Sequence, residues 1–212
     1  MEITHQRKTW EDQFGEEYLK RNVYNPKELN ELYNNRFGFT KDQINDQFLK
    51  DIPKDAKILE VGTNIGNQLF HLQSQGFTNL YGIEIQSRAI NYAKHRTDNL
   101  NIIKGDALDI PFKDNYFDVV FTHGVLIHIS PANINKVLDE IYRVTKKYIW
   151  GFEYYAPVYT DLEYHGQKNL MWKTDFCRLY QEQFPTLNLI KEQKYKYLTD
   201  ANLEDQIYLL SK

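Results

Sequence analysis

The stretch KILEVGTNIG, residues 57–66, decides the fold class of this chain. It begins with a short apolar run that is typical of a buried strand, and Gly62 and Gly66 follow. Glycines between a strand and a helix let backbone amides approach a ligand, because no Cβ atom blocks the way. The pattern from Ile65 to Gln75 predicts that helix, and Gly76 is placed to end it. The stretch therefore indicates the first strand–turn–helix unit of an α/β protein.

Strands and helices alternate after this unit. Further strands are expected at residues 80–84, 101–104, 117–122, 148–153, 187–198 and 206–210, and helices at residues 87–96, 130–145 and 175–184. Ser87 and Ser130 are placed to cap two of the helices, and Pro131 fits a first turn. The alternation favours a parallel sheet. The last two strands are joined by a short polar segment, which suggests an antiparallel hairpin.

The N-terminal quarter of the chain has a different pattern. Residues 9–50 are polar with aromatic residues at spacings near four, which predicts helices. Pro26 suits the first turn of a new helix, and a further short helix should end before Pro53. We expect residues 1–53 to form a helical cap packed on a core domain of residues 54–212.

Composition excludes several classes of protein. The 212 residues include one cysteine, Cys177, so neither an intrachain disulfide nor a cysteine-based zinc site can form, and no metal site is expected. The formal net charge of -3 gives no support to a nucleic-acid partner. No run of apolar residues is long enough to span a membrane, and the polar start shows no signal peptide. We therefore expect a cytoplasmic protein, and the oligomeric state stays open.

The glycine turn and the next strand suggest an adenosine-type cofactor. Glu84 ends the second strand, where an acidic residue can accept both hydroxyls of a ribose. A dinucleotide fingerprint would need glycine at 62, 64 and 67, and only Gly62 matches. The pattern acidic-x-G-x-G-x-G matches at Glu60, Gly62 and Gly66, and departs only at Asn64, a residue type that tolerates a left-handed backbone.

Four blocks together resemble the class I S-adenosylmethionine-dependent methyltransferases, namely residues 58–66, 82–84, 105–107 and 117–120. The resemblance implies a Rossmann-like, mostly parallel sheet of seven strands with helices on both faces and the last strand antiparallel. It implies S-adenosylmethionine as cofactor, with S-adenosylhomocysteine as product. The implied cofactor residues are Glu60, Gly62, Thr63, Asn64, Gly66, Glu84, Ile85, Asp106, Ala107, Thr122 and His123.

Within that resemblance, single residues carry single contacts. Glu84 would hold the ribose, Asp106 and the Ala107 amide would meet the adenine edge, and Ile85 would pack on its face. The carbonyl near Thr122 or His123 would bind the methionine amino group. Arg21, which follows an aromatic helix stripe, is added because that stripe is placed to cover the cofactor.

A narrower resemblance covers nearly the whole chain. Residues 121–129, 153–155, 164–166 and 172–176, with the aromatic segments between residues 10 and 22, are similar to methylases associated with pseudaminic acid biosynthesis. The resemblance implies a small-molecule acceptor, namely a nonulosonic acid sugar, its precursor or its nucleotide-activated form.

Three residues are candidates for catalysis. His123 follows the fourth strand at the ligand edge, and histidine is the usual general base near neutral pH. His128 lies shortly after it, and Glu153 ends the fifth strand, where it would orient a histidine or bind sugar hydroxyls. A sugar hydroxyl needs such a base because its proton must leave, whereas a carboxylate acceptor does not.

An insertion at about residues 154–175 supplies the expected acceptor site. Its flat side chains suit the faces of sugar rings, and its lysine suits a carboxylate or phosphate. The candidates are Tyr154, Tyr155, Tyr164, His165, Trp172 and Lys173. Two other functions stay open: an NAD-dependent sugar oxidoreductase, and a non-catalytic module that binds S-adenosylmethionine.

Overall fold

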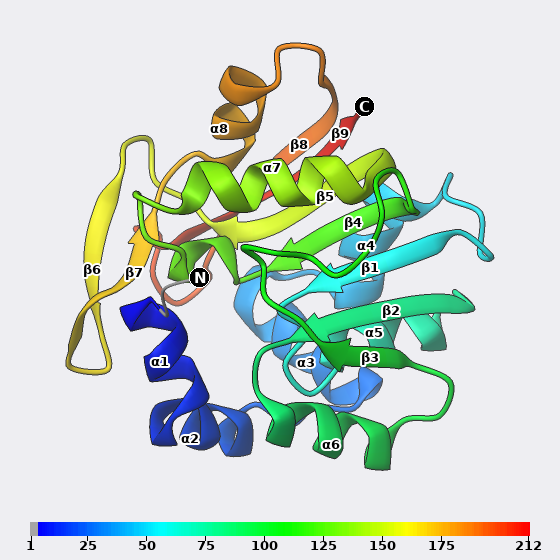
Figure 1. The fold of residues 1–212 in the computed structure, drawn as a ribbon, viewed down its shortest axis with the longest axis horizontal. Helices are drawn as coiled ribbons and strands as arrows, with labels where there is room; N and C mark the ends of the chain where they lie inside the picture. The colour runs from blue at the N-terminus through cyan, green and yellow to red at the C-terminus, as the bar shows by residue number, and fades with distance from the viewer. Residues whose placement is uncertain (1–3) are drawn as a thin grey trace.

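A seven-stranded sheet runs through the centre of the molecule, in the order β3-β2-β1-β4-β5-β9-β8 (Figure 1). The computed structural model describes residues 4–212, so the first three residues of the expected 1–53 segment lie outside it. The strands are β1 (Lys57–Val61), β2 (Asn79–Glu84), β3 (Asn101–Lys104), β4 (Phe117–His123), β5 (Thr145–Tyr154), β8 (Asn188–Lys196) and β9 (Glu204–Ser211), with a separate hairpin of β6 (Thr160–Tyr164) and β7 (Gln167–Lys173). The helices are α1 (His5–Glu11), α2 (Gln13–Arg21), α3 (Pro26–Phe37), α4 (Lys41–Leu49), α5 (Asn67–Ser74), α6 (Ser87–Arg96), α7 (Ile134–Val144) and α8 (Phe176–Gln183), with a short 3₁₀ helix, η1 (Leu126–His128).

The strand directions confirm the expected sheet. β1 pairs in parallel with β2 and β4, and β4 pairs in parallel with β5. β9 pairs antiparallel with both β5 and β8, so the last strand alone runs against the others. Because parallel strands end at the same edge, the segments after β1, β2, β4 and β5 meet there.

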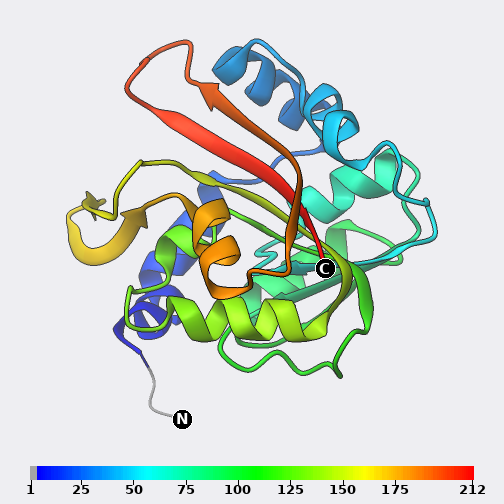
Figure 2. The ribbon, with the colours of Figure 1, turned by 90° about the horizontal axis from the view of Figure 1, so that it is seen from above.

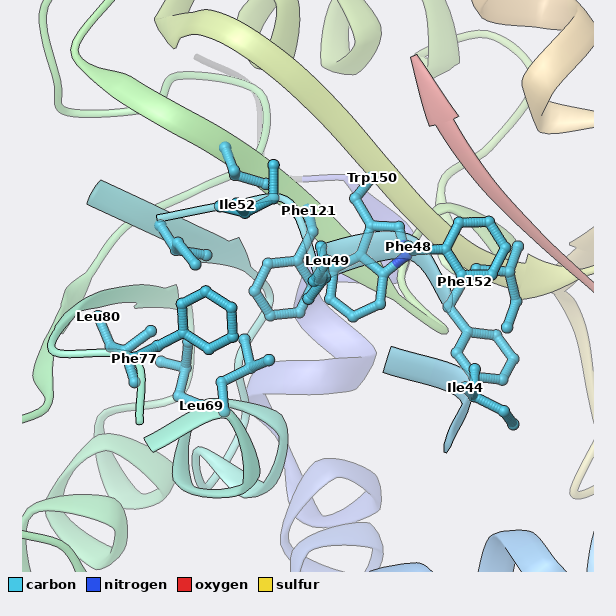
Figure 3. Close-up of a cluster of buried hydrophobic side chains, with 14 of the residues drawn as sticks. Ile44, Phe48, Leu49, Ile52, Leu69, Phe77, Leu80, Phe121, Trp150 and Phe152 are labelled. Carbon is cyan, nitrogen blue, oxygen red and sulfur yellow. The ribbon is translucent and has the colours of Figure 1, made fainter. Parts of the chain in front are cut away.

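Helices cover both faces of the sheet (Figure 2). α7 and α8 pack on one face, and α3 to α6 pack on the other. Phe48 and Leu49 of α4 enter the same buried cluster as Phe121 of β4 and Trp150 of β5 (Figure 3). The N-terminal helices therefore divide into two pairs, since α3 and α4 belong to a helical layer while α1 and α2 lie beside the carboxyl edge (Figure 1).

Local chemistry explains where several elements begin. α3 starts at Pro26 as expected, with Asn25 and Glu28 forming a reciprocal capping box. The expected start of a helix at Ser130 is wrong, because residues 130–133 form a turn and α7 begins at Ile134. Ser87 does not cap α6 either, because it is already the first helical residue.

The hairpin of β6 and β7 lies in the expected insertion, although the sequence pattern did not predict its strands. His165 and Gly166 both have positive φ and make the tight turn between them. Among residues 4–212 no helix is long and apolar enough to cross a membrane.

Candidate active site

Two adjoining cavities open at the carboxyl edge of the sheet. The first, which we call the glycine-loop cavity, has a volume of about 200 Å³ and is lined by the segments after β1, β2, β3 and β4 and by α1. The second, which we call the tyrosine cavity, has a volume of about 350 Å³ and is lined by α2, α3, β5, β6 and β9. Both are lined by a shared set, which we call the junction: Tyr18, Asn22, Asn67, Gln68, His123, Gly124 and His128.

The turn after β1 has the left-handed backbone that its sequence predicts. Gly62, Asn64 and Gly66 have φ values of 72°, 49° and 77°. The amides of Gly62 and Thr63 donate to the carbonyl of Ile83, which fixes the turn against β2. Asparagine thus takes the conformation of the missing glycine, at a position where few other side chains are tolerated.

Glu84 lines the glycine-loop cavity, and its side chain is largely buried. One oxygen accepts from the amide of Asn64 at 2.8 Å, and the other accepts from the amide of Gln86 at 2.9 Å. Burial raises the pKa of Glu84, and hydrogen bonds from these two amides and from that of Ile85 oppose the rise. With three amides on its two oxygens, the carboxylate keeps one acceptor position for a hydroxyl of a bound ligand.

Asp106 and Ala107 line the same cavity after β3. One oxygen of Asp106 accepts from the Leu108 amide, and the other accepts from Arg7 of α1 at 2.9 Å. α1 is thereby tied to the far end of the glycine-loop cavity. Trp10, also on α1, lines this cavity with a buried indole N–H that has no partner among the described residues.

A neutral polar cluster forms one wall of the junction. The Tyr33 hydroxyl is hydrogen-bonded to Nε2 of His123, and Gln68 lies close enough to influence the pKa of Tyr33. Burial, reinforced by the nearby charge of Lys41, holds the pKa of His123 well below its usual range. The Gln68 amide oxygen is buried without a partner in residues 4–212, so the junction offers an unused acceptor.

His128 presents a free ring nitrogen to both cavities. Its Nδ1 lies 2.8 Å from the carbonyl oxygen of Leu170 on β7. Because a carbonyl only accepts, Nδ1 carries the proton and Nε2 keeps its lone pair. No described residue bonds to Nε2. Burial lowers the pKa of His128 to about 4, so the ring is a neutral proton acceptor at neutral pH.

Glu153 is placed differently from its expected role. It lines neither cavity, and its oxygens accept from the amides of Val125 and Ile127 at 3.2 and 3.4 Å. The side chain is fully buried, and this burial raises its pKa to about 7. Glu153 therefore holds the segment between the two histidines instead of facing a ligand.

Most of the expected cofactor residues come together. Those that line the glycine-loop cavity are Glu60, Gly62, Thr63, Asn64, Glu84, Ile85, Asp106, Ala107 and His123. Gly66 does not, because the position of its missing Cβ faces Ile102 in the core at 3.1 Å. Thr122 is buried behind the wall, and Arg21 lines the tyrosine cavity instead.

The expected acceptor residues are divided. Tyr154, Tyr164 and His165 line the tyrosine cavity. Tyr155, Trp172 and Lys173 line neither cavity: Tyr155 stacks under Lys194 and Trp172 is 6% exposed. Lys173 lies behind the wall, with its Nζ 5.4 Å from the centre of the Tyr154 ring.

Sequence reasoning missed other lining residues, chiefly Tyr33, Gln68, Gly124, Arg36 and Asp205. Gly124 had a signal, because it directly follows His123 at a strand end. It has a φ of 63°, and the position of its missing Cβ faces open space at the junction. The others lie within ordinary helix or strand patterns, so nothing in their local sequence marks them.

Comparison with known proteins indicates which reaction the chain catalyses. The family described as "Methyltransferase domain" matches residues 59–148. Phosphoethanolamine N-methyltransferase of Plasmodium falciparum is 23% identical over 184 residues, covering 76% of this chain and 69% of that protein. These matches identify the chain as an S-adenosylmethionine-dependent methyltransferase. This assignment decides against the oxidoreductase alternative.

Other relatives of this methyltransferase match a shorter stretch of sequence or resemble it in fold. Sterol 24-C-methyltransferase of Pneumocystis carinii is 31% identical over 101 residues, but the match covers 45% of this chain and 26% of that protein. Among solved structures, a chain from a Haloferax volcanii complex between a methyltransferase activator and a methyltransferase has a TM-score of 0.68 at 16% identity, and covers 97% of this chain and 96% of its own. A Burkholderia thailandensis 1,6-didemethyltoxoflavin-N1-methyltransferase has a TM-score of 0.64 at 14% identity, with 78% and 75% covered.

The residues present fit S-adenosylmethionine. Glu84 offers an acceptor for a ribose hydroxyl, and the Gln68 oxygen, which has no partner among the described residues, offers an acceptor for the methionine ammonium. Asp106 and the Ala107 amide lie where the adenine edge is expected. When bound, this cofactor supplies a methyl group on a positively charged sulfur. The small-molecule acceptor must then meet that methyl group at the junction.

Proposed function

We propose that this methyltransferase acts on an acidic sugar of the nonulosonic (pseudaminic) type, on its precursor or on its nucleotide-activated form. The supporting observation is the character of the tyrosine cavity. Two arginines, Arg21 and Arg36, line it together with aromatic side chains, and neither guanidinium has an ion-pair partner among the described residues. A cavity with unpaired cations and flat aromatic walls suits a sugar that carries a carboxylate or a phosphate.

The aromatic walls match the two kinds of surface on a sugar. Tyr18, Tyr154 and Tyr164 come from α2, β5 and β6 and line the same cavity. Tyrosine offers an apolar face for the ring carbons and a hydroxyl for a polar substituent. The sequence resemblance to pseudaminic-acid methylases points to the same class of acceptor.

The geometry favours His128 over His123 as proton acceptor. Nε2 of His123 is taken by the Tyr33 hydroxyl, whereas Nε2 of His128 is free at the junction. Methyl transfer to a hydroxyl forms a carbon–oxygen bond and breaks the carbon–sulfur bond. The hydroxyl proton then passes to Nε2 of His128, and the imidazolium later releases it to water. The backbone carbonyl of Leu170 keeps the ring in the required tautomer.

A second candidate acceptor is a phosphorylated amino alcohol. It is favoured by the match to phosphoethanolamine N-methyltransferase, which extends well beyond residues 59–148, and by the same pair of arginines. An amine acceptor also loses a proton on methylation, so the role of His128 is unchanged.

Mass spectrometry of acceptor panels separates the candidates. The enzyme is incubated with S-adenosylmethionine and with nonulosonic acids, their nucleotide-activated forms or phosphoethanolamine, and H128N serves as the matched control. We expect a methylated sugar with the wild-type enzyme and a rate at least about 100-fold lower with H128N. Methylation of phosphoethanolamine alone would replace the sugar by the second candidate. Methylation of neither compound would reject both acceptors.

A further inference from the structure

We propose that the guanidinium of Arg36 forms an anion subsite in the tyrosine cavity. It binds the carboxylate or phosphate of the acceptor as an anchor, so that another atom of the acceptor is methylated. The subsite rests on the acidic acceptor proposed above. It adds that Arg36 binds the negative charge of the acceptor, and that this anionic group is not itself methylated.

Arg36 is presented to the cavity as a rigid, unpaired cation. It lies in the last turn of α3, and its guanidinium carbon lies 5.2 Å from the centre of the Tyr197 ring and 5.9 Å from that of Phe37. Its guanidinium makes no ion pair or hydrogen bond with any residue that the structure describes. Stacking on rings fixes the plane of a guanidinium and leaves its N–H edges available for bidentate binding of a carboxylate or phosphate.

The neighbouring Asp205 does not cancel this charge. Its buried carboxylate lines the same cavity and accepts from the Tyr197 hydroxyl, which lies 3.2 and 3.3 Å from its two oxygens. Burial raises the pKa of Asp205 to about 7, although the charges of Arg36 and Lys173 oppose the rise. The cavity is thus lined by two arginines, Arg21 and Arg36, and by one carboxylate that is partly protonated at neutral pH, so it keeps a net attraction for an anion.

The position of Arg36 decides which atom is methylated. Arg36 lines the tyrosine cavity but not the glycine-loop cavity, and the junction between them contains no arginine or lysine. The methyl group must be transferred at the junction, since only there do the two cavities meet. An anion held by Arg36 is therefore set back from the transferred methyl group, and a hydroxyl or amine of the same molecule faces His128. The product keeps its negative charge.

Isothermal titration calorimetry tests the subsite on enzyme saturated with S-adenosylhomocysteine. The probes are N-acetylneuraminate, its methyl ester, which lacks the negative charge, and phosphoethanolamine. The variants are R36Q, R36K and, as a matched control, R178Q, which removes an exposed arginine on α8. Binding of S-adenosylhomocysteine reports that each variant is folded.

We expect R36Q to weaken binding of N-acetylneuraminate by about tenfold or more, R36K to weaken it less, and R178Q to leave it unchanged. The methyl ester should bind weakly and respond little to R36Q. A response of phosphoethanolamine alone would identify the anion as a phosphate. The subsite is overturned if no anionic probe binds the wild type, or if R36Q binds them equally well. A methyl ester as reaction product would overturn the anchor but keep the acceptor. Binding of the acid without methylation would keep the anion subsite but reject the acidic sugar as the acceptor.

Discussion

Replacing Lys41 with methionine should stabilise this methyltransferase. Lys41 is 1% exposed, and its Nζ has no hydrogen-bond partner within residues 4–212. The nitrogen lies 4.6, 4.9 and 5.4 Å from the ring centres of Phe152, Tyr33 and Trp150. Aromatic faces attract a cation, but they replace only part of the hydration that it loses on burial. Methionine has a similar volume and brings no charge into the same space.

The magnitude follows from the pKa of Lys41, which burial lowers from 10.5 to about 7. Each pKa unit corresponds to about 1.4 kcal/mol, so the lowered value corresponds to at most about 5 kcal/mol of lost stability at neutral pH. The cation–π contacts return about 2 kcal/mol of this in the wild type. We therefore expect K41M to raise the free energy of unfolding by up to about 3 kcal/mol at pH 7.

The sign of the pH dependence separates this cause from better packing. A lysine whose pKa is lowered in the folded state releases its proton on folding, so the unfolded chain binds more protons between the two pKa values. Wild-type stability therefore rises with pH from about 7 to 10.5 through Lys41. Glu60, whose pKa burial raises to about 8, acts in the opposite sense below that pH. Between about pH 8 and 9 the gain from K41M should shrink by up to about 1.4 kcal/mol.

Urea unfolding at about pH 7, 8 and 9 measures the effect on the wild type, K41M and K147M. Lys147 is the matched control because its Nζ lies over one ring, that of Tyr148, in an exposed position. K147M should change stability by less than about 0.5 kcal/mol at every pH. A loss of stability in K41M at neutral pH would refute the reasoning. So would a gain that stays constant between pH 8 and 9.

Three further predictions concern single residues. With the pKa of His128 lowered to about 4, the turnover rate should stay flat above about pH 5 and fall as the pH drops through 4, as a pH–rate profile of kcat would show. Replacing Glu84 with glutamine should weaken binding of S-adenosylhomocysteine by about tenfold to 100-fold in calorimetry, with E163Q on the exposed hairpin as control. Gly151→Ala should lose about 3 kcal/mol or more in urea unfolding, because the new Cβ would lie 2.0 Å from the buried Tyr208 ring.

The central sheet could be predicted because its signals are local. β1 and β3 occupy the expected residues, and each is followed directly by a glycine, Gly62 or Gly105. The glycine pattern also pointed to residues that the structure gathers in one cavity, since Glu60, Gly62 and Glu84 lie within one strand–turn–helix–strand unit. Because consecutive elements of such a unit pack together, the sequence spacing of these residues was enough to predict that they lie at the same edge of the sheet.

Element boundaries were less predictable where the backbone makes a turn before a helix. Ser130 and Pro131 have the sequence of a helix start, but the Ser130 carbonyl accepts from the amides of both Asn133 and Ile134. A single turn therefore precedes α7. β6 alternates between half-buried and exposed side chains, but five residues make the pattern too short to reveal the strand. Tertiary contacts hold the β6–β7 hairpin in place, such as that between Leu170 and His128.

The acceptor side of the site could not be read from the sequence because it has no local motif. Arg36 and Asp205 come from α3 and β9, and only the folded chain brings them to one cavity. The expectation for Glu153 failed for a related reason. A carboxylate at the end of a strand faces either a ligand or nearby backbone amides, and the turn of residues 124–128 decided this case.

The division between the two cavities also explains why family membership does not name the acceptor. The methyltransferase family matches residues 59–148, which contain His123, Gly124 and His128 and the glycine-loop residues that fit the cofactor. Arg36 lies before that stretch and Asp205 lies after it. The other wall residues of the tyrosine cavity on α2, α3, β5, β6 and β9 also lie outside residues 59–148. A chain can therefore keep the residues that fit the cofactor, and the proposed proton acceptor His128, while every outer wall of the tyrosine cavity changes. The acceptor must be identified from the charges of that cavity and not from the names of relatives.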